Sequence, residues 1–395
     1  MRFLRQAFTA VLLGLYTIPQ RLSSAGVAIV GIAGVVVVLV AVLSIGEGFK
    51  AAMVNAGRPD RAIVMRQGAD SELSSGLDGP SVDVIKQAPG IKQDGSTSVA
   101  SAEMFVVIDV NRRTTNTSSN VPLRGVEPTV LAVRTEAKIV EGRMLTFGTN
   151  EVVVGRAANG QFSNLNVGDV LKAGQVSWSV VGIFSTNGTA AETEIWCDVR
   201  SIQGAYRRGN SYQSVLAKLD SAAAFDAFKD SLTTNPQVDV QVKRESEYYA
   251  EQSKTLTGLI QGIGYGIAFL MGLGAIFGAV LTMYSAVVTR TREIATLRAL
   301  GFGSFPVLLS VLGESLTLAL VGGIIGGALA YIGFNGYQTS TMNWQSFSQV
   351  AFGFAVTPNL LIQGLVYALV MGFIGGVLPA IRAARLPIAT ALREL

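Results

Sequence analysis

Residues 287–303 read VVTRTREIATLRALGFG, a charged turn between two long apolar runs. The flanking runs, 256–288 and 302–334, are each long enough to cross roughly 30 Å of hydrocarbon as a helix. Two further apolar runs, 23–46 and 359–379, contain no charged residue. The sequence therefore predicts a membrane protein with four transmembrane α-helices.

Composition excludes several kinds of chemistry. The 395 residues are 49% hydrophobic and only 15% charged, with no histidine and a single cysteine, Cys197. This removes Ser-His-Asp triads, histidine-assisted thiols, histidine-containing zinc sites and intrachain disulfides, and we expect no metal site. Cys197 is therefore interpreted as a buried structural residue rather than a nucleophile. Basic residues are not interleaved with aromatics, so we expect no nucleic-acid binding.

The long segment 47–255 has the features of a large mixed α/β domain. Short β-type runs (RAIVMRQG, AEMFVVIDV, NEVVVG, WSVVGIF) are separated by Gly, Asn and Asp turn signals. SVDVIKQAPGIK and SAAAFDAFKDSLTTNPQVDVQV each indicate a helix followed by a strand. We infer one lobe, 58–98 plus 210–245, interrupted by an inserted β-rich lobe, 99–209. An undivided domain is the alternative.

Charge asymmetry predicts the orientation. Segments 1–22, 289–303 and 380–395 together hold nine Arg and no Lys, whereas 47–254 is nearly balanced with 22 basic and 24 acidic residues. By the positive-inside rule both termini are cytoplasmic and the large domain is periplasmic, in a bacterial inner membrane. The first apolar run begins beyond residue 20 and lacks an A-x-A exit, which favours a retained span over a signal peptide.

The predicted order of segments follows from these observations. It is an amphipathic cytoplasmic or interfacial helix (1–22), span one (23–46), the periplasmic domain (47–255), span two (256–288), a cytoplasmic helix (289–301), span three (302–334), a periplasmic loop (335–358), span four (359–379) and a cytoplasmic tail (380–395).

Glycines recur four residues apart within the spans. Such pairs let helix backbones approach closely in lipid and favour a compact bundle or a dimer, although general tolerance of glycine in membrane helices is the alternative. The pairs are Gly274 and Gly278, Gly322 and Gly326, Gly323 and Gly327, and Gly372 and Gly376.

Glu314 is the one ionisable residue well inside a predicted span. A carboxylate there is costly, so it is a candidate for function by default. A structural polar contact and a role in gating or transport both remain open.

The helix predicted over 289–301 has a mixed surface. Ile294, Leu297 and Leu300 form an apolar stripe edged by arginines, and Arg290 can pair with Glu293 one turn on. Such a helix can lie on anionic lipid or insert into a groove of a cytosolic protein. The sequence contains no G-x-x-x-x-G-K-[ST] phosphate loop, so we do not expect this chain to hydrolyse ATP alone.

TRTREIATLRALGFGSFPVLLSVLGESLTLALVGGIIGGALA resembles the C-terminal permease domain of the FtsX/MacB family of ABC transporters. The closing VLPAIRAARLPIATALREL is similar to the tail of the same family, although it lacks the usual Asp before Pro387. GVEPTVLAVRTEAKIVEGRML and VGDVLKAGQVSWSVVGIF resemble the family's periplasmic core domain. The resemblance covers nearly the whole chain.

The resemblance implies a non-catalytic permease subunit that binds no cofactor and docks a separate cytosolic ABC ATPase, which holds ATP and Mg. The 289–301 segment would be its coupling helix, and 44–55 and 245–259 a stalk that transmits mechanical work to the periplasm. The residues implied in docking are Arg290, Arg292, Glu293, Ile294, Leu297, Arg298, Leu300 and Gly301. Arg382 and Arg385 are singled out in the cytoplasmic tail. The lobe formed by 58–98 and 210–245 would be the porter-like lobe of this family.

The expected partners are the lipid bilayer and a second permease, identical or a paralogue. The expected activity is export or extraction of a periplasmic substrate, with or without a membrane-fusion protein and an outer-membrane duct. The alternative is an FtsX-like transducer that regulates a periplasmic cell-wall hydrolase. A membrane enzyme is disfavoured because no credible catalytic set is present.

Overall fold

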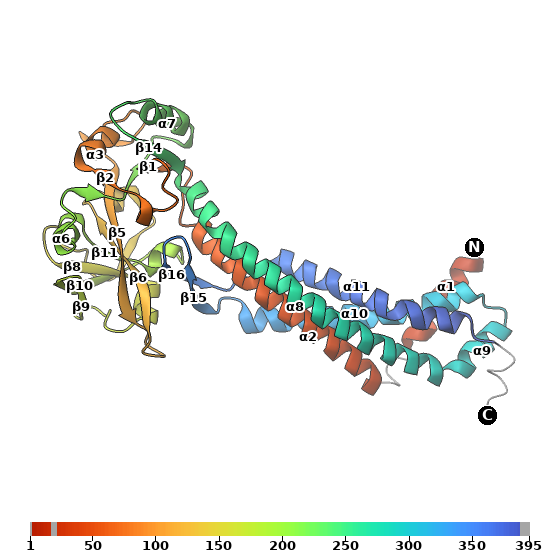
Figure 1. Ribbon diagram of the computed structural model, residues 1–395. Coiled ribbons are helices and arrows are strands. Elements are labelled where there is room, and N and C mark those ends of the chain that lie inside the picture. Colours follow the sequence, from red (N-terminus) through yellow and green to blue (C-terminus); the bar gives the residue numbers. More distant parts are fainter. Residues whose placement is uncertain (1, 17–21, 388–395) are drawn as a thin grey trace. The chain divides into compact units, whose positions relative to one another are not determined.

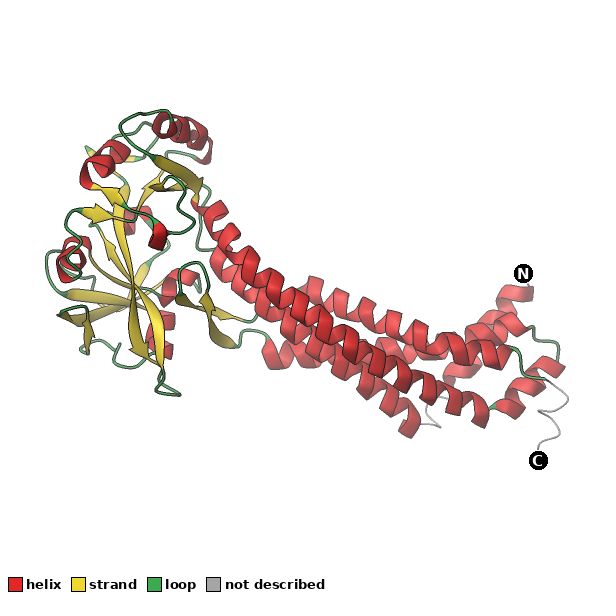
Figure 2. Cartoon of the chain, viewed as in Figure 1, coloured by secondary structure: helices red, strands yellow, loops and turns green. Residues whose placement is uncertain are grey.

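The computed structural model describes residues 2–16 and 22–387 (Figure 1). Strands and short helices gather in one part of the chain and long helices in the other (Figure 2). These parts are two compact units, each described below by itself. The helical unit is Met1–Glu47, Leu259–Tyr337 and Phe354–Leu395, and the α/β unit is Gly48–Gly258 and Gln338–Gly353. The predicted fold class, four membrane helices with a large mixed α/β domain, is confirmed.

Within the described residues, four helices are long and apolar enough to cross a membrane. They are α2 (Leu22–Val54), α8 (Glu245–Thr289), α10 (Ser304–Phe334) and α11 (Pro358–Ala384), and two shorter helices are α1 (Arg2–Tyr16) and α9 (Thr291–Ala299). Helix α8 begins at Glu245, where the implied stalk 245–259 begins, and runs through the predicted span 256–288. ESEYYAEQSKT contains no Gly or Pro to stop the helix. Helix α2 likewise continues beyond 46 to Val54.

Helix α11 continues beyond Pro379, the predicted end of span four, through this buried proline to Ala384. A proline removes one helical hydrogen bond, but a packed membrane helix tolerates it when its neighbours compensate. The helix ends where the Arg385 amide donates back to the Ile381 carbonyl (3.2 Å). The predicted tail 380–395 is therefore helical at its start, and residues 388–395 lie outside the described residues.

Glycines bring the helices of the helical unit close together. A Cβ at Gly326 of α10 would lie 2.6 Å from the Ala33 carbonyl oxygen of α2, and one at Gly372 of α11 would lie 2.4 Å from the Ala319 Cβ. Three of the four predicted pairs thus pack helix on helix. The fourth does not, since a Cβ at Gly274 or Gly278 of α8 would meet nothing within 4 Å.

Helix α1, predicted to lie at the membrane interface, packs against α10. A Cβ at Gly14 would lie 2.7 Å from the Ser310 Oγ, and one at Gly313 would lie 3.2 Å from a Val11 methyl group. Phe8 of this helix is exposed. Of the predicted segment 1–22, residues 1 and 17–21 lie outside the described residues.

The α/β unit is built on a ten-stranded sheet in the order β14-β1-β13-β5-β6-β11-β8-β10-β7, with β9 paired to β10. The strands are β1 (Arg61–Arg66), β5 (Ala100–Asn111), β6 (Ser118–Val126), β7 (Lys138–Gly142), β8 (Glu151–Gly155), β9 (Val170–Ala173), β10 (Val176–Ser185), β11 (Ile195–Asp198), β13 (Ser214–Lys218) and β14 (Val240–Arg244). The four runs predicted from sequence correspond to β1, β5, β8 and β10.

Shorter elements cover the faces and edges of this sheet. The α-helices are α3 (Gly79–Lys86), α4 (Val130–Val133), α5 (Arg156–Gln161), α6 (Val199–Ala205) and α7 (Phe225–Thr233). The 3-10 turns are η2 (Glu72–Ser74), η3 (Ala190–Thr193) and η4 (Ala222–Ala224), and the two-residue strands are β2 (Leu77–Asp78), β3 (Gln93–Asp94), β4 (Thr97–Ser98) and β12 (Ser211–Tyr212).

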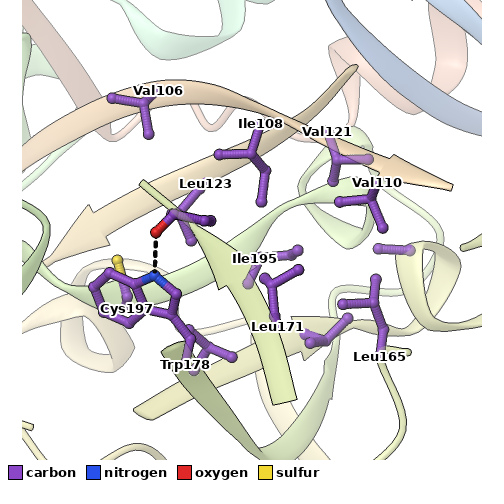
Figure 3. Close-up of a cluster of buried hydrophobic side chains, with 14 of the residues drawn as sticks. Val106, Ile108, Val110, Val121, Leu123, Leu165, Leu171, Trp178, Ile195 and Cys197 are labelled. Carbon is purple, nitrogen blue, oxygen red and sulfur yellow. Dashed lines mark hydrogen bonds between the residues drawn. The ribbon is translucent and has the colours of Figure 1, made fainter. Parts of the chain in front are cut away.

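The sheet carries two hydrophobic cores that share one long strand. The first half of β5, including Ala102, packs in a core with β1, β13, α3 and α7. Its second half, from Met104 on, packs in the core around Trp178 and Cys197 (Figure 3). There the Trp178 indole N–H donates to the Ala173 carbonyl (3.1 Å). The two cores follow the inferred lobes, but one continuous strand joins them.

The segment 335–358, predicted as a plain loop, contains a β-hairpin. Its strands are β15 (Gln338–Asn343) and β16 (Ser348–Gly353), paired antiparallel from Gln338 with Gly353 to Asn343 with Ser348. The hairpin belongs to the α/β unit, although the chain on either side belongs to the helical unit.

Candidate functional site

Helix α9 lies at the same end of the helical unit as α1 and the end of α11 (Figure 1). It follows α8 after Arg290 and stops before α10. Gly301 ends it with a φ of +96°, a left-handed conformation that favours glycine. Its amide donates to the Arg298 carbonyl (3.1 Å), and the Phe302 amide donates to that of Leu297 (3.1 Å). Gly301 thus shapes the turn instead of offering a side chain to a partner.

The apolar stripe of α9 is not one exposed surface, which corrects the prediction. Ile294 is only 5% exposed and packs in a cluster with Met283, Val307 and Ala383 of α8, α10 and α11. Leu297 is half-buried, whereas Leu300 is 74% exposed. The buried residues fix α9 on the bundle, so Ile294 cannot also contact another protein in this conformation.

The outward face of α9 is made by Arg292, Glu293, Thr296 and Leu300, all of them exposed. Their spacing of three or four residues places them along one side of the helix. The outward face carries both charge signs and one large apolar side chain.

Arg290 joins this turn to α10. Its Nε donates to Glu293 Oε2 (2.9 Å), as predicted, and its Nη1 donates to Glu314 Oε2 (3.3 Å). Glu314 is 4% exposed, and the Arg290 side chain is 12% exposed. The intramembrane acid therefore makes a structural polar contact, which was one of its two predicted roles. That contact leaves a role in gating untested.

The end of α11 also contacts α9 and α8. The Arg298 guanidinium donates to the Leu386 carbonyl, and the Arg382 guanidinium lies 5.4 Å from the centre of the Tyr284 ring. Arg385 is exposed. The structure thus brings the predicted tail arginines to the same end of the helical unit as α9.

A buried ionic network in the α/β unit was not predicted. Arg124, on β6, donates to Glu72 Oε1 (2.6 Å), Glu103 Oε2 (2.8 Å) and Glu194 Oε1 (2.8 Å). Arg134 donates to both oxygens of Glu103. Burial would raise the pKa of Glu103, but the two guanidinium groups hold it below its ordinary value. The only signal in the sequence was an arginine inside an apolar strand, VPLRGV.

Neither a metal nor a thiol site emerges from the described residues. Among them, no group of three His, Cys, Asp or Glu side chains is placed to hold a metal ion. Cys197 is fully buried as predicted, and burial, with the nearby Asp198, raises the pKa of its thiol well above the usual range. A neutral buried thiol is a poor nucleophile.

Two domain-family models match most of the chain. The MacB-like periplasmic core domain matches residues 25–235, and the FtsX-like permease C-terminal domain matches residues 265–388.

Relatives share moderate identity with the chain. The macrolide export ATP-binding/permease protein MacB of Bdellovibrio bacteriovorus is 24% identical over 70% of this chain and 44% of its own length. That of Azoarcus sp. is 24% identical over 92% of this chain and 55% of its own length. The uncharacterized ABC transporter permease YknZ of Bacillus subtilis is 31% identical over 35% of this chain and 32% of its own length. The chain thus spans about half the length of these MacB relatives or less.

Among solved structures, the periplasmic region of MacB from Actinobacillus actinomycetemcomitans is similar, with a TM-score of 0.37 and 15% identity over 49% of this chain and 92% of that one. The four membrane helices and the two domain matches together identify a multi-pass membrane protein. The chain belongs to the FtsX/MacB family of ABC transporter permeases.

Proposed function

We propose that this chain couples ATP hydrolysis by an ATPase outside this sequence to movement of its α/β unit. That movement drives export or extraction of a substrate from the periplasmic side. The energy enters through α9, the stalk parts of α2 and α8 carry it, and a second permease copy or a paralogue completes the transporter.

The observation that carries this proposal is the two-sided packing of α9. Ile294 and Ala295 are buried against the membrane helices, while Arg292, Glu293, Thr296 and Leu300 are exposed. A helix fixed to two long spans through its inner face passes a push on its outer face to both of them. An exposed face that combines a large apolar side chain with charged ones is also typical of docking surfaces between proteins.

Two further observations support the need for an ATPase partner. The given sequence has no phosphate loop, and the printed name of the MacB relatives joins an ATP-binding function to a permease. We propose that ATP and Mg are bound by such a partner and that this chain holds no cofactor.

The charge distribution supports the orientation. Arginines without lysines at 1–22, 289–303 and 380–395 favour a cytoplasmic location for these segments. The α/β unit then lies in the periplasm of a bacterial inner membrane, where a membrane-fusion protein and an outer-membrane duct are candidate further partners.

The test is co-purification of the ATPase with variants of the outward face. We expect Leu300→Asp and Arg292→Glu to lower recovery of the ATPase about tenfold or more, because truncating central interface anchors typically costs that much affinity. Arg156→Glu, an equal charge reversal at an exposed arginine of the α/β unit, is the control. Full recovery with both α9 variants, in chains that remain monodisperse, refutes docking at α9.

Co-purifying periplasmic proteins separate transport from regulation. A membrane-fusion protein or a lipoprotein in the purified complex supports export or extraction. A peptidoglycan hydrolase in their place supports the FtsX-like alternative.

A further inference from the structure

The hairpin formed by β15 and β16, residues 338–353, is the feature of the fold that the proposed function leaves unexplained. It is the chain that connects α10 to α11, so any movement of these two helices pulls on both of its ends. Its own contacts, however, are with the α/β unit. We call this segment the strap.

One side of the strap is bonded to the inserted lobe. The Ala351 amide donates to Thr193 Oγ1 (2.8 Å), at the end of η3. Asn120 Nδ2, on β6, donates to the Phe347 carbonyl (2.9 Å), and Arg112 Nη2 donates to Gln349 Oε1 (3.0 Å). Separate segments of one lobe thus hold the strap in place.

Another side of the strap contacts the parts of α2 and α8 that belong to the same unit. Asn343 Nδ2 donates to Gln252 Oε1 (2.8 Å), and both side chains are buried. The Phe352 ring meets the Phe49 ring edge-on, 5.7 Å between centres, and both are almost fully buried. These are core contacts and not those of a mobile loop.

The strap also borders the ionic network. A small cleft is lined by Arg124 and Glu194 of the network, by Gln252 of α8, and by Asn343 and Ser348 of the strap. The two lobes, the start of α8 and the strap therefore meet around one small cleft.

The strap sequence, QTSTMNWQSFSQVAFG, contains no charged residue. Most of its bonds are between neutral groups, so added salt should not loosen them. Breaking them would leave buried donors and acceptors without partners, which costs more than the bonds contribute when formed. The strap is therefore built to stay docked during movement of the helices.

We propose that the strap is a second mechanical connection, which delivers movement of α10 and α11 directly to the inserted lobe, in parallel with the route through α8. This proposal rests on the proposed function, because α9 is the turn between α8 and α10 and moves both when an ATPase pushes it. It assigns force-transmitting roles to Thr193, Asn120 and Gln349, which bond the strap to the inserted lobe.

The test is hydrogen exchange on the full complex of permease and ATPase in nanodiscs, nucleotide-free and trapped with ATP and vanadate. In the wild type we expect amides of 338–353 to stay protected in both states, and the inserted-lobe peptide containing Thr193 to respond to nucleotide. Asn120→Ala and Gln349→Ala, which remove bonds between the strap and the inserted lobe, should lower protection of the strap roughly tenfold. They should abolish the response of the inserted lobe and leave that of 245–252 intact.

Two further variants separate this mechanism from misfolding. Thr193→Val keeps the side-chain volume but removes the acceptor for the Ala351 amide. It therefore weakens the attachment of the strap to the inserted lobe and should also abolish the response of that lobe to nucleotide. Trp344→Ala, at the exposed tip of the strap, should behave as the wild type.

Two results overturn the proposal. One is a response of the inserted lobe to nucleotide that persists when the strap is released, or a wild type in which the inserted lobe shows no response at all. The other is a strap that loses protection when nucleotide binds to the wild type, because it would then be a latch that opens. Failure of the proposed function is distinguishable, since it would appear as a wild-type chain that recovers no ATPase at all.

Discussion

Replacing Arg124 with Met tests how much the buried ionic network holds the two lobes together. The Arg124 side chain is 2% exposed and contacts Glu72 from the porter-like lobe as well as Glu103 and Glu194 from the inserted lobe. Methionine has a similar length but donates no hydrogen bond. The variant therefore leaves buried carboxylates without their shared cation, while Arg134 still pairs with Glu103.

The size of the effect follows from this geometry. Removing one partner of a buried ion pair typically costs about 3–5 kcal/mol, because the remaining charge is left uncompensated. For a unit of this size, each kcal/mol shifts the midpoint of thermal unfolding by about 2–4 °C. We therefore expect Arg124→Met to lower the midpoint by about 6–20 °C.

Tryptophan fluorescence of the full chain in detergent is the assay. The three tryptophans, Trp178, Trp196 and Trp344, all belong to the α/β unit, so the signal reports on that unit alone. The control is Arg143→Met, whose ion pair with Glu151 is at the surface, with the arginine side chain 54% exposed. Exposed pairs contribute about 0–1 kcal/mol. A midpoint for Arg124→Met no lower than that of the control would refute the reasoning.

Three further outcomes are expected. Glu103→Gln destabilises the α/β unit at neutral pH. The difference in unfolding free energy from the wild type narrows as the pH falls through the lowered pKa of Glu103, because protonation removes the ion pairs of Glu103 from the wild type as well. Urea unfolding at pH 7 and below pH 4.5 checks this. Gly326→Ala disrupts the contact of α10 with α2 and lowers the thermal stability of the chain, whereas Gly274→Ala, whose added methyl group meets nothing within 4 Å, leaves the stability of the monomer unchanged. Calorimetric thermal unfolding in detergent distinguishes the two variants. Glu314→Gln keeps a hydrogen-bond acceptor for Arg290, so ATPase activity of the complex stays coupled; uncoupled hydrolysis would instead assign Glu314 to gating.

The membrane helices could be predicted because their signal is local. An uncharged apolar run of about 20 residues can span the bilayer as a helix whatever the rest of the chain does. The ends of the helices were harder to predict. The polar start of α8 at Glu245 and the passage of α11 through Pro379 depend on neighbouring segments that a hydropathy reading cannot include.

The surface of α9 shows where periodicity reaches its limit. The spacing of Ile294, Leu297 and Leu300 correctly places them near one another, but it cannot say which neighbour covers each. Ile294 turns inward on the bundle and Leu300 remains outside, and only the packed structure distinguishes them. The glycine pairs repeat this lesson, since Gly326 packs on α2 while Gly274 faces outward with the same spacing.

The hairpin and the ionic network could not be predicted because their stability is tertiary. QTSTMN shows no alternation of apolar and polar residues, so its strand is ordered by pairing with β16 and by docking on the α/β unit. The acids around Arg124 come from Glu72, Glu103 and Glu194, which are far apart in sequence. An arginine within an apolar strand can signal that partners exist but not which they are.

Photo-crosslinking from α9 tests the central claim most directly. A benzophenone amino acid at Leu300, activated in intact cells, should produce an adduct with an ABC ATPase, identified by mass spectrometry. The same probe at Leu281, which is exposed on the membrane part of α8, should not. An ATPase adduct from Leu300 alone is the predicted result. Adducts only with lipid, or with the same proteins from both positions, would contradict the account of α9 as the entry point for energy.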